Sequence, residues 1–340
     1  MTLLLPYGLR LLCLTLAAGA LSYAAGLLLA ALAAPAVLRR AARRDARGEA
    51  RRLLVWRLAP ALLSATVVGL LCLPSYLWLE PRGDREAWGW GVCLVAIAGL
   101  ALALDVGRRA ARALLLSWRY GWRCRQQADP DARPESGCLV LSSRQPVMAL
   151  AGLWRPRILI SRSVLACLTP EQLAASLRHE QAHRAAGDNW KRLLLASTPA
   201  PGPRLARLER AWARAAEWAA DDHSVTSPGR SPRARARHSL QLAGALVAVA
   251  RLGAPASEAP LVSALLSAHR APTAAPAHAA SRELEARVRR LLESPPSPPR
   301  RATLGLWRAA ALAATAAVVA LALAPTTLNC VHQLIEFCVH

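Results

Sequence analysis

Two histidines and a glutamate near the middle of the chain have the spacing of a catalytic zinc site. Residues 179–183 read His-Glu-Gln-Ala-His, which is the pattern H-E-x-x-H. On a helix, residues four apart share a face, so His179 and His183 can bind one Zn²⁺. Glu180, beside them, is placed to act as general base on a water molecule. The pattern arises by chance in roughly one chain in a hundred of this length, so it needs support from the rest of the sequence.

A second stretch supplies that support. A catalytic zinc needs a third protein ligand and a position left open for water. Residues 211–222 have the composition of a helix, and Glu217 and Asp221 share one of its faces. Glu217 is the natural third ligand, and Asp221 can fix a ligand histidine through its second ring nitrogen. Asp188, five residues after His183, is another candidate for that orienting role. A solvated helix face with two ordinary histidines would not account for this additional set.

The H-E-x-x-H motif lies in a segment with a clear helix start. Thr169 is expected to be the N-cap, Pro170 the first helical residue, and Gln172 the partner that closes a capping box. From Leu173 onward the chain is rich in good helix formers, so the motif should lie inside this helix. Residues 197–203 read S-T-P-A-P-G-P and break the pattern before the helix that carries Glu217.

Three short extended stretches precede the motif, at 138–141, 147–150 and 157–160, separated by turn sequences. In a protease, a small sheet beside the metal helix can hold a substrate chain extended by strand addition. A sheet that only packs on the helix is an equally good interpretation, because proteins also protect sheet edges for stability.

The composition predicts a mainly helical, polytopic membrane protein. Of 340 residues, 54 % are hydrophobic, and this share falls in long blocks of Leu, Ala and Val. We expect a three-helix membrane region over 1–106 and a fourth transmembrane helix over 303–325. Between them, 107–302 is soluble in character and is expected to form an α+β zincin-like metalloprotease domain. The first three spans are predicted at 9–38, 53–79 and 88–106.

The net charge of +22 comes almost entirely from arginine, much of it flanking the apolar blocks. It is better explained by arginines that face an anionic leaflet of the lipid bilayer than by direct nucleic-acid binding, since no nucleic-acid-reading module accompanies it. The positive-inside rule places the basic loop 39–52 and the region 107–302 in the cytoplasm of a multi-pass plasma (inner) membrane protein. The N-terminus and the short tail 326–340, which has no Lys or Arg, are then extracytoplasmic.

The eight cysteines show no C-x-x-C pairing, so no zinc ribbon or redox motif is indicated. Cys330 and Cys338, after the last span, are the only pair to consider for a disulfide. In the same tail His332, Glu336 and His340 recur every four residues, which gives one helix face some metal-binding potential. A tail helix that rests on the membrane surface is the favoured interpretation of this pattern.

Several segments resemble one known family. P-V-M-A-L-A-G-L-W-R-P-R-I-L-I-S (146–161), the stretch 168–183 with Asp188, E-W-A-A-D-D-H-S-V (217–225) and R-E-L-E-A-R-V-R-R-L-L (282–292) are similar to the BlaR/MecR type of integral-membrane zinc metallopeptidases. These proteins are the sensor-transducers of beta-lactam resistance and their relatives. The resemblance implies a gluzincin-like site that faces the cytoplasm, and it implies the ligand and base roles already assigned above.

The chain departs from that family in two ways. After the last predicted span there is only a short tail and no penicillin-binding module with S-x-x-K, so beta-lactam sensing is not supported. Near position 238 relatives often carry Tyr, whereas this chain has His238. His238 or His223 could donate to the oxyanion formed in peptide hydrolysis. A surface histidine is the preferred interpretation of each, because histidine is commonly exposed.

The sequence therefore predicts a membrane-embedded zinc endopeptidase that acts as a signal transducer. The resemblance implies two candidate protein substrates, namely the chain itself and a cytoplasmic repressor of the BlaI/MecI type. The alternative is a non-catalytic membrane signalling protein that uses the zinc fold as a structural, partner-binding module. An intact Glu180 favours the enzyme, because a purely structural site needs no base. The sequence leaves open the signal and whether the chain forms a homo-oligomer.

Overall fold

The computed structural model describes most of the chain as two compact units of mainly helical structure with two small sheets. One unit comprises Met1–Pro35, Trp56–Gly107 and Arg300–His340, and the other comprises Ala36–Val55 and Arg108–Pro299. The described residues are 2–41, 45–81, 86–129, 138–143, 145–226, 231–253, 263–264, 277–293, 316–317 and 319–339.

Within the described residues, three helical segments are long and apolar enough to cross a membrane: Tyr7–Arg40, Ala46–Leu79 and Trp90–Gln126. The first belongs to α1 (Tyr7–Ala41), and the third is α4 (Trp90–Gln126). The second is built from α2 (Ala46–Thr66), the π-helical turn η1 (Val67–Cys72) and α3 (Leu73–Leu79). Large apolar side chains such as Leu32 and Leu94 are more than 60 % exposed, as expected of helices that face lipid. The predicted fourth span at 303–325 lies largely outside the described residues.

The third apolar helix differs from its predicted bounds at both ends. It begins at Trp90, because Glu86–Gly89 forms strand β2, which pairs antiparallel with β1 (Thr2–Leu5). A partner more than eighty positions away cannot be recognised from local pattern. The same helix runs past the predicted end at residue 106 to Gln126. The added stretch is rich in Arg, Ala and Leu and contains no proline, so nothing in it ends the helix.

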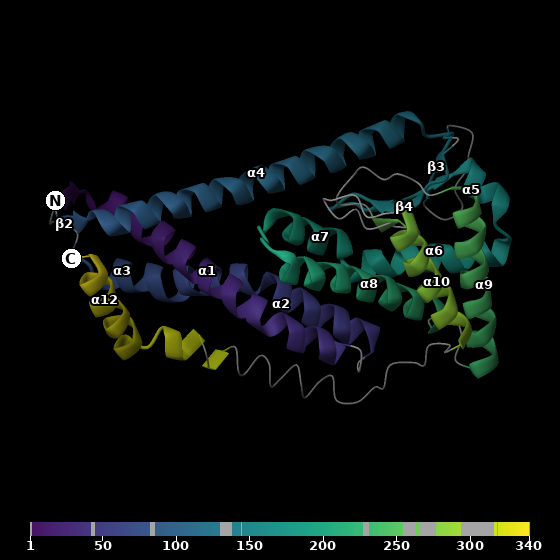
Figure 1. The fold of residues 1–340 in the computed structure, drawn as a ribbon. Helices are drawn as coiled ribbons and strands as arrows, with labels where there is room; N and C mark the ends of the chain where they lie inside the picture. Colours follow the sequence, from purple (N-terminus) through teal and green to yellow (C-terminus); the bar gives the residue numbers. More distant parts are fainter. Residues whose placement is uncertain are drawn as a thin grey trace. The chain divides into compact units, whose positions relative to one another are not determined.

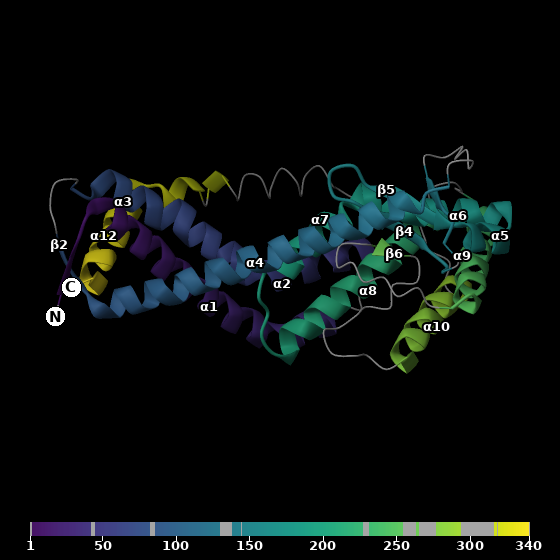
Figure 2. The same cartoon turned by 90° about the horizontal axis from the view of Figure 1, so that it is seen from above.

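The tail forms helix α12 (Pro325–Val339), which packs on α3 (Figures 1 and 2). The hydroxyl of Ser75 donates to the carbonyl oxygen of Leu328 at 3.1 Å, inside this contact. Cys330 is an exposed free thiol. Eight residues of helix separate it from Cys338, or roughly 12 Å of rise, whereas a disulfide needs Cα atoms less than about 7 Å apart. The disulfide considered from the sequence is therefore incompatible with this helix.

A four-stranded sheet lies at the centre of the second unit, in the order β3-β5-β4-β6. The three predicted strands are confirmed to within a residue or two, and the two-residue strand β6 was not predicted. Strand β5 pairs parallel with β3 and antiparallel with β4, and β6 pairs antiparallel with the other edge of β4. The strands are β3 (Leu139–Leu141), β4 (Met148–Ala151), β5 (Arg157–Ser161) and β6 (Ser263–Ala264).

Alternate residues along the strands pack into two different apolar clusters, one on each face of the sheet. Met148 and Ile160 point into the larger core with Leu242 and Leu246 of the helices, while Ala149 packs in a smaller cluster on the other face. The sheet is thus buried on both sides. The described helices that lie wholly in this unit are α5 (Arg162–Cys167), α6 (Pro170–Ala186), α7 (Asp188–Ser197), α8 (Pro203–Thr226), α9 (Pro232–Arg251) and α10 (Ala277–Glu293).

The predicted start of the motif helix is confirmed. The side chain of Thr169 accepts from the backbone N–H of Gln172 at 3.3 Å, and Gln172 Oε1 accepts from the N–H of Thr169 at 3.1 Å. The helix ends at Ala186, and Gly187 is its C-cap. The φ of Gly187 is 68°, in the left-handed region that glycine adopts at little cost. The chain turns there directly into α7, and α6 itself packs on α8 and α9. These contacts determine which side chains lie beside the H-E-x-x-H motif of α6.

Candidate metal centre

The site forms where α6 packs on α8. Ser224 of α8 donates from its hydroxyl to the carbonyl oxygen of Ala175 at 2.7 Å, and Arg178 Nε donates back to the carbonyl oxygen of Ser224 at 3.2 Å. These bonds fix one helix against the other a turn away from the motif. His179 and His183 are completely buried between the two helices.

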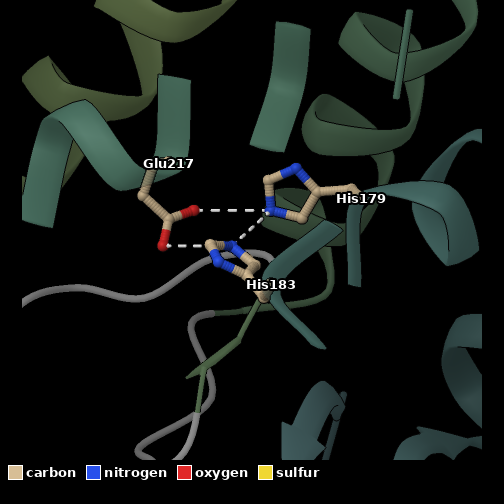
Figure 3. A group of neighbouring side chains, drawn as sticks. All are labelled: His179, His183 and Glu217. Carbon is tan, nitrogen blue, oxygen red and sulfur yellow. Dashed lines mark hydrogen bonds and ion pairs between the residues drawn. The ribbon is translucent and has the colours of Figure 1, made fainter. Parts of the chain in front are cut away.

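Three potential ligand atoms converge at this contact (Figure 3). The Nε2 atoms of His179 and His183 lie 3.2 Å apart. Oε2 of Glu217 lies 3.5 Å from Nε2 of His179, and Oε1 lies 3.7 Å from Nε2 of His183. Neither oxygen of Glu217 has a hydrogen-bond partner within the described residues. The structure therefore brings together the two predicted histidine ligands and the predicted third ligand in a cluster that could hold a metal ion.

The second ring nitrogen of each histidine contacts a carboxylate. Nδ1 of His183 lies 2.7 Å from Oδ2 of Asp188, and Nδ1 of His179 lies 2.9 Å from Oδ1 of Asp221. If each Nδ1 carries the proton, both Nε2 atoms present lone pairs to each other at 3.2 Å. A cation between them would turn that repulsion into two bonds. Asp188 and Asp221 thus lie where the orienting role predicted for them requires.

Arg287 of α10 is a site residue that the sequence interpretation missed. It is buried, and its Nη1 lies 3.2 Å from Oε2 of Glu217. It also binds the carboxylate of Asp221 through Nε and Nη2. The sequence did contain a sign that Arg287 is buried. Helix α10 is amphipathic, and position 287 falls on the same face as Leu284 and Leu291, which pack in the core. An arginine on a buried helix face requires a carboxylate partner.

Glu180 is next to the ligand His179 in the chain, and its carboxylate has no hydrogen-bond partner among the described residues. The residue is completely buried, and neither carboxylate oxygen is hydrogen-bonded within the described part of the chain. Burial raises the pKa of Glu180 to about 7, although the nearby His179 and His183 act to lower it. A carboxylate that changes protonation near neutral pH and has no competing donor suits proton transfer.

The carboxylates around the histidines are held in their charged form. Burial alone would raise the pKa of Glu217, but His183 and Arg287 hold that pKa well below its ordinary value. Asp188 has a lowered pKa for the same kind of reason, because His183 and Lys191 outweigh its burial. Lys191 Nζ lies 2.6 Å from Oδ1 of Asp188. The ligand carboxylate is therefore ready for a cation without first losing a proton.

The two histidines considered as oxyanion donors lie elsewhere on their helices. His223 is an exposed residue of α8. His238 of α9 is partly buried, and its pKa is lowered by burial and by Arg178, against a backbone hydrogen bond with Val225. Among the described residues, no contact joins either histidine to the three-ligand cluster. Their role as oxyanion donors stays a prediction.

A second group with metal-ligating side chains lies in the first unit, at α12. Nε2 of His332 lies 3.2 Å from Oε1 of Glu336, and its Nδ1 lies 3.9 Å from Oε2 of Glu80. The two carboxylates thus approach different ring nitrogens, and Arg10 already binds Glu80 at 2.9 Å. A metal would have to displace these contacts, so this group is better described as an ion-paired cluster. His340, the third residue of the tail pattern, lies outside the described residues.

Neither a family model nor a curated protein matches the sequence of this chain. The function is therefore inferred from the geometry of the site.

Proposed function

We propose that this chain is a membrane-embedded zinc endopeptidase. The observation that carries the proposal is the convergence of His179, His183 and Glu217 beside the unpartnered carboxylate of Glu180. Ligands at zinc-bond lengths around a tetrahedral ion lie roughly 3.3 Å from one another. The two Nε2 atoms here are 3.2 Å apart, and each lies 3.5 or 3.7 Å from one of the two carboxylate oxygens of Glu217. Two imidazoles and one carboxylate form the ligand set of zinc peptidases, which leaves one position for the reacting groups.

The chemistry divides among the residues of the site. Zinc, when bound, would supply Lewis-acid activation of the attacking water and of the peptide carbonyl. Glu180 takes the proton of the attacking water on its carboxylate and then gives it to the nitrogen of the leaving amine. Asp188 and Asp221 keep the two imidazole rings in the orientation and tautomer that present Nε2 to the ion. His238 and His223 are the candidate donors to the oxyanion.

The arrangement of the chain in the membrane is also part of this proposal. The three apolar helices support a membrane protein, and we propose a fourth span at 303–325 with a cytoplasmic zincin-like domain over 107–302. This organisation is the one that the resemblance to the BlaR/MecR peptidases, read from the segments at 146–161, 168–183 and 217–225, implies. A cytoplasmic repressor of the BlaI/MecI type is then a candidate substrate.

A specific observation favours self-cleavage as one activity. Strand β6 occupies the edge of β4, with Ala264 opposite Ala149 and Ser263 opposite Leu150. The same two strands contact α6, and Asn189 donates to the carbonyl oxygen of Gly152 at 2.7 Å beyond the end of β4. Extended peptides bind proteases in this way, by adding a strand to a sheet edge. The segment around Ser263 is therefore a candidate internal substrate.

A non-catalytic signalling protein with a structural metal is the alternative. A structural zinc is four-coordinate with protein ligands, whereas the described residues offer three at this cluster. A buried carboxylate without a hydrogen-bond partner is also costly and needs a functional reason. Both features support the enzyme.

The test is an immunoblot of membranes that contain the tagged full chain, together with any repressor-like protein produced with it. The Glu180→Gln variant is matched in shape and keeps all three proposed ligands. We expect a fragment of the chain or of the repressor that is present with the wild type and absent with Glu180→Gln. Identical patterns at equal zinc content and equal expression, under every inducing condition tried, would favour the non-catalytic alternative.

A further inference from the structure

A cavity of about 550 Å³ lies in the second unit, away from the three-ligand cluster. One wall comes from the first two apolar helices, through Leu38 near the end of α1 and Glu49 near the start of α2. The other wall is a stripe of α8 at helical spacing, formed by Arg207, Arg210, Ala211, Arg214 and Trp218.

The cavity is strongly basic. Arg207, Arg210 and Arg214 are exposed, and none of the three forms an ion pair with a carboxylate within the described residues. Glu49 is the one acidic side chain that lines the cavity, so the lining carries more positive than negative charge. Guanidinium groups bind phosphate oxygens through two parallel N–H groups. Three guanidiniums at one cavity suit a phosphate, which has more acceptor oxygens than a single carboxylate.

Trp218 adds an amphipathic side to the cavity. The guanidinium carbon of Arg290 lies over the ring of Trp218, 5.3 Å from the ring centroid. Its indole Nε1 is buried and has no hydrogen-bond partner among the described residues. A buried indole N–H normally finds an acceptor, so an oxygen atom of a bound molecule would complete this group. Together with Leu38 and Ala211, the ring also offers an apolar surface beside the arginines.

The position of the cavity along the chain points to a lipid. Leu38 lies near the end of the apolar segment Tyr7–Arg40, and Glu49 lies near the start of the segment Ala46–Leu79. The ends of such helices lie at the depth of the lipid headgroups. Basic pockets beside the cytoplasmic ends of transmembrane helices are typical sites for anionic headgroups, with the apolar part of the lipid against the helix.

We infer that this cavity binds the phosphate headgroup of an anionic phospholipid, held by Arg207, Arg210 and Arg214 against Leu38 and Trp218. The site is separate from the proposed zinc centre, although α8 also carries Glu217 and Asp221. Lipid bound here would restrain the helix that supplies the third ligand.

The experiment measures lipid binding by the purified full chain in detergent, using native mass spectrometry. Phosphatidylglycerol is the anionic probe and phosphatidylcholine the neutral one. We expect the variant Arg207→Gln/Arg210→Gln/Arg214→Gln to lose about tenfold or more in affinity for phosphatidylglycerol, because each basic side chain near an anionic headgroup contributes several-fold. Binding of phosphatidylcholine should not change.

The matched control is Arg233→Gln/Arg237→Gln/Arg251→Gln, which removes the same charge from exposed positions of α9. Its affinity for phosphatidylglycerol should change by less than about twofold. Equal losses in the two triple variants would overturn the inference, because general attraction would then explain the binding. Failure of the wild type to prefer the anionic lipid would overturn it too.

Two further arms complete the test. Inorganic phosphate at the same concentration should not displace the lipid; full displacement would identify a site for a free anion and overturn the assignment to a lipid. If the Gln variant does not fold, the Arg→Lys triple variant keeps the charge and should keep most of the lipid affinity, while Arg210→Gln alone should still weaken it measurably. Zinc content serves as the independent readout, since it should be equal in all these variants whether or not the lipid site exists.

Discussion

Arg287 and Asp221 form a paired contact in which Nε lies 2.9 Å from Oδ2 and Nη2 lies 2.7 Å from Oδ1. Both residues are buried, and the same guanidinium also reaches Oε2 of Glu217. One cation thus positions the proposed third ligand and the carboxylate that orients His179. It connects α10, which lies far along the chain from the motif, to the metal cluster.

Replacing Arg287 should therefore weaken metal binding without removing a ligand. We expect Arg287→Gln to lower zinc affinity about 10- to 100-fold, as is typical when a group behind the ligands is lost. The measurement is a competition titration with a zinc chelator on the purified full chain. The control is Arg289→Gln on the same helix, where the side chain is exposed and pairs with Glu285. An affinity that is equal in both variants would show that Arg287 does not position the ligands.

The two orienting carboxylates should behave alike. Asp188→Asn and Asp221→Asn keep the size of the side chain but weaken the contact with Nδ1 of each ligand histidine. We expect zinc affinity to fall about 10- to 100-fold in each, less than in His183→Ala. Asp222→Asn is the matched control, because Asp222 pairs with Arg290 and not with a histidine. Zinc loss in Asp222→Asn as large as in Asp221→Asn would contradict the assignment.

Zinc binding should become stronger as the pH rises. In the metal-free protein, burial lowers the pKa of His183, but Glu217 and Asp188 outweigh it and raise the pKa above its ordinary value. The imidazole is then protonated at neutral pH, and a metal must displace that proton. Below this raised pKa, affinity should increase about tenfold per pH unit for each proton released. Chelator titrations at roughly pH 6 and pH 8 measure this; an affinity that does not change with pH would contradict it.

Pairing of β6 with β4 can be tested apart from the metal. A proline at position 263 removes the backbone N–H of a residue that faces Leu150 in the strand pair, and proline cannot donate a hydrogen bond to a strand ladder. If the segment is an internal substrate, Ser263→Pro should reduce self-cleavage several-fold and leave zinc content unchanged. Cleavage of a separate repressor-like protein should persist or increase, because the edge of β4 becomes more accessible. Unchanged self-cleavage in this variant would assign the cut to another segment.

Local sequence signals predicted the parts of the structure that depend on local chemistry. The capping box at Thr169, the alternation of apolar residues in the three strands and the four-residue spacing of His179 and His183 each follow from neighbouring residues. The pairing of β1 with β2, the docking of β6 on β4 and the role of Arg287 depend on contacts between distant parts of the chain. Arg287 could have been suspected only from its place on an apolar helix face.

The central claim is that His179, His183 and Glu217 hold a zinc ion beside a catalytic base. The most direct measurement is the metal content of the purified full chain by mass spectrometry of the dissolved metal, for the wild type and for Glu180→Gln, Glu217→Ala and His183→Ala. We expect about one zinc per chain in the wild type and in Glu180→Gln, and well under one in the two ligand variants. A wild-type protein without zinc after purification in zinc-containing buffer, or full zinc in Glu217→Ala and His183→Ala, would contradict the account.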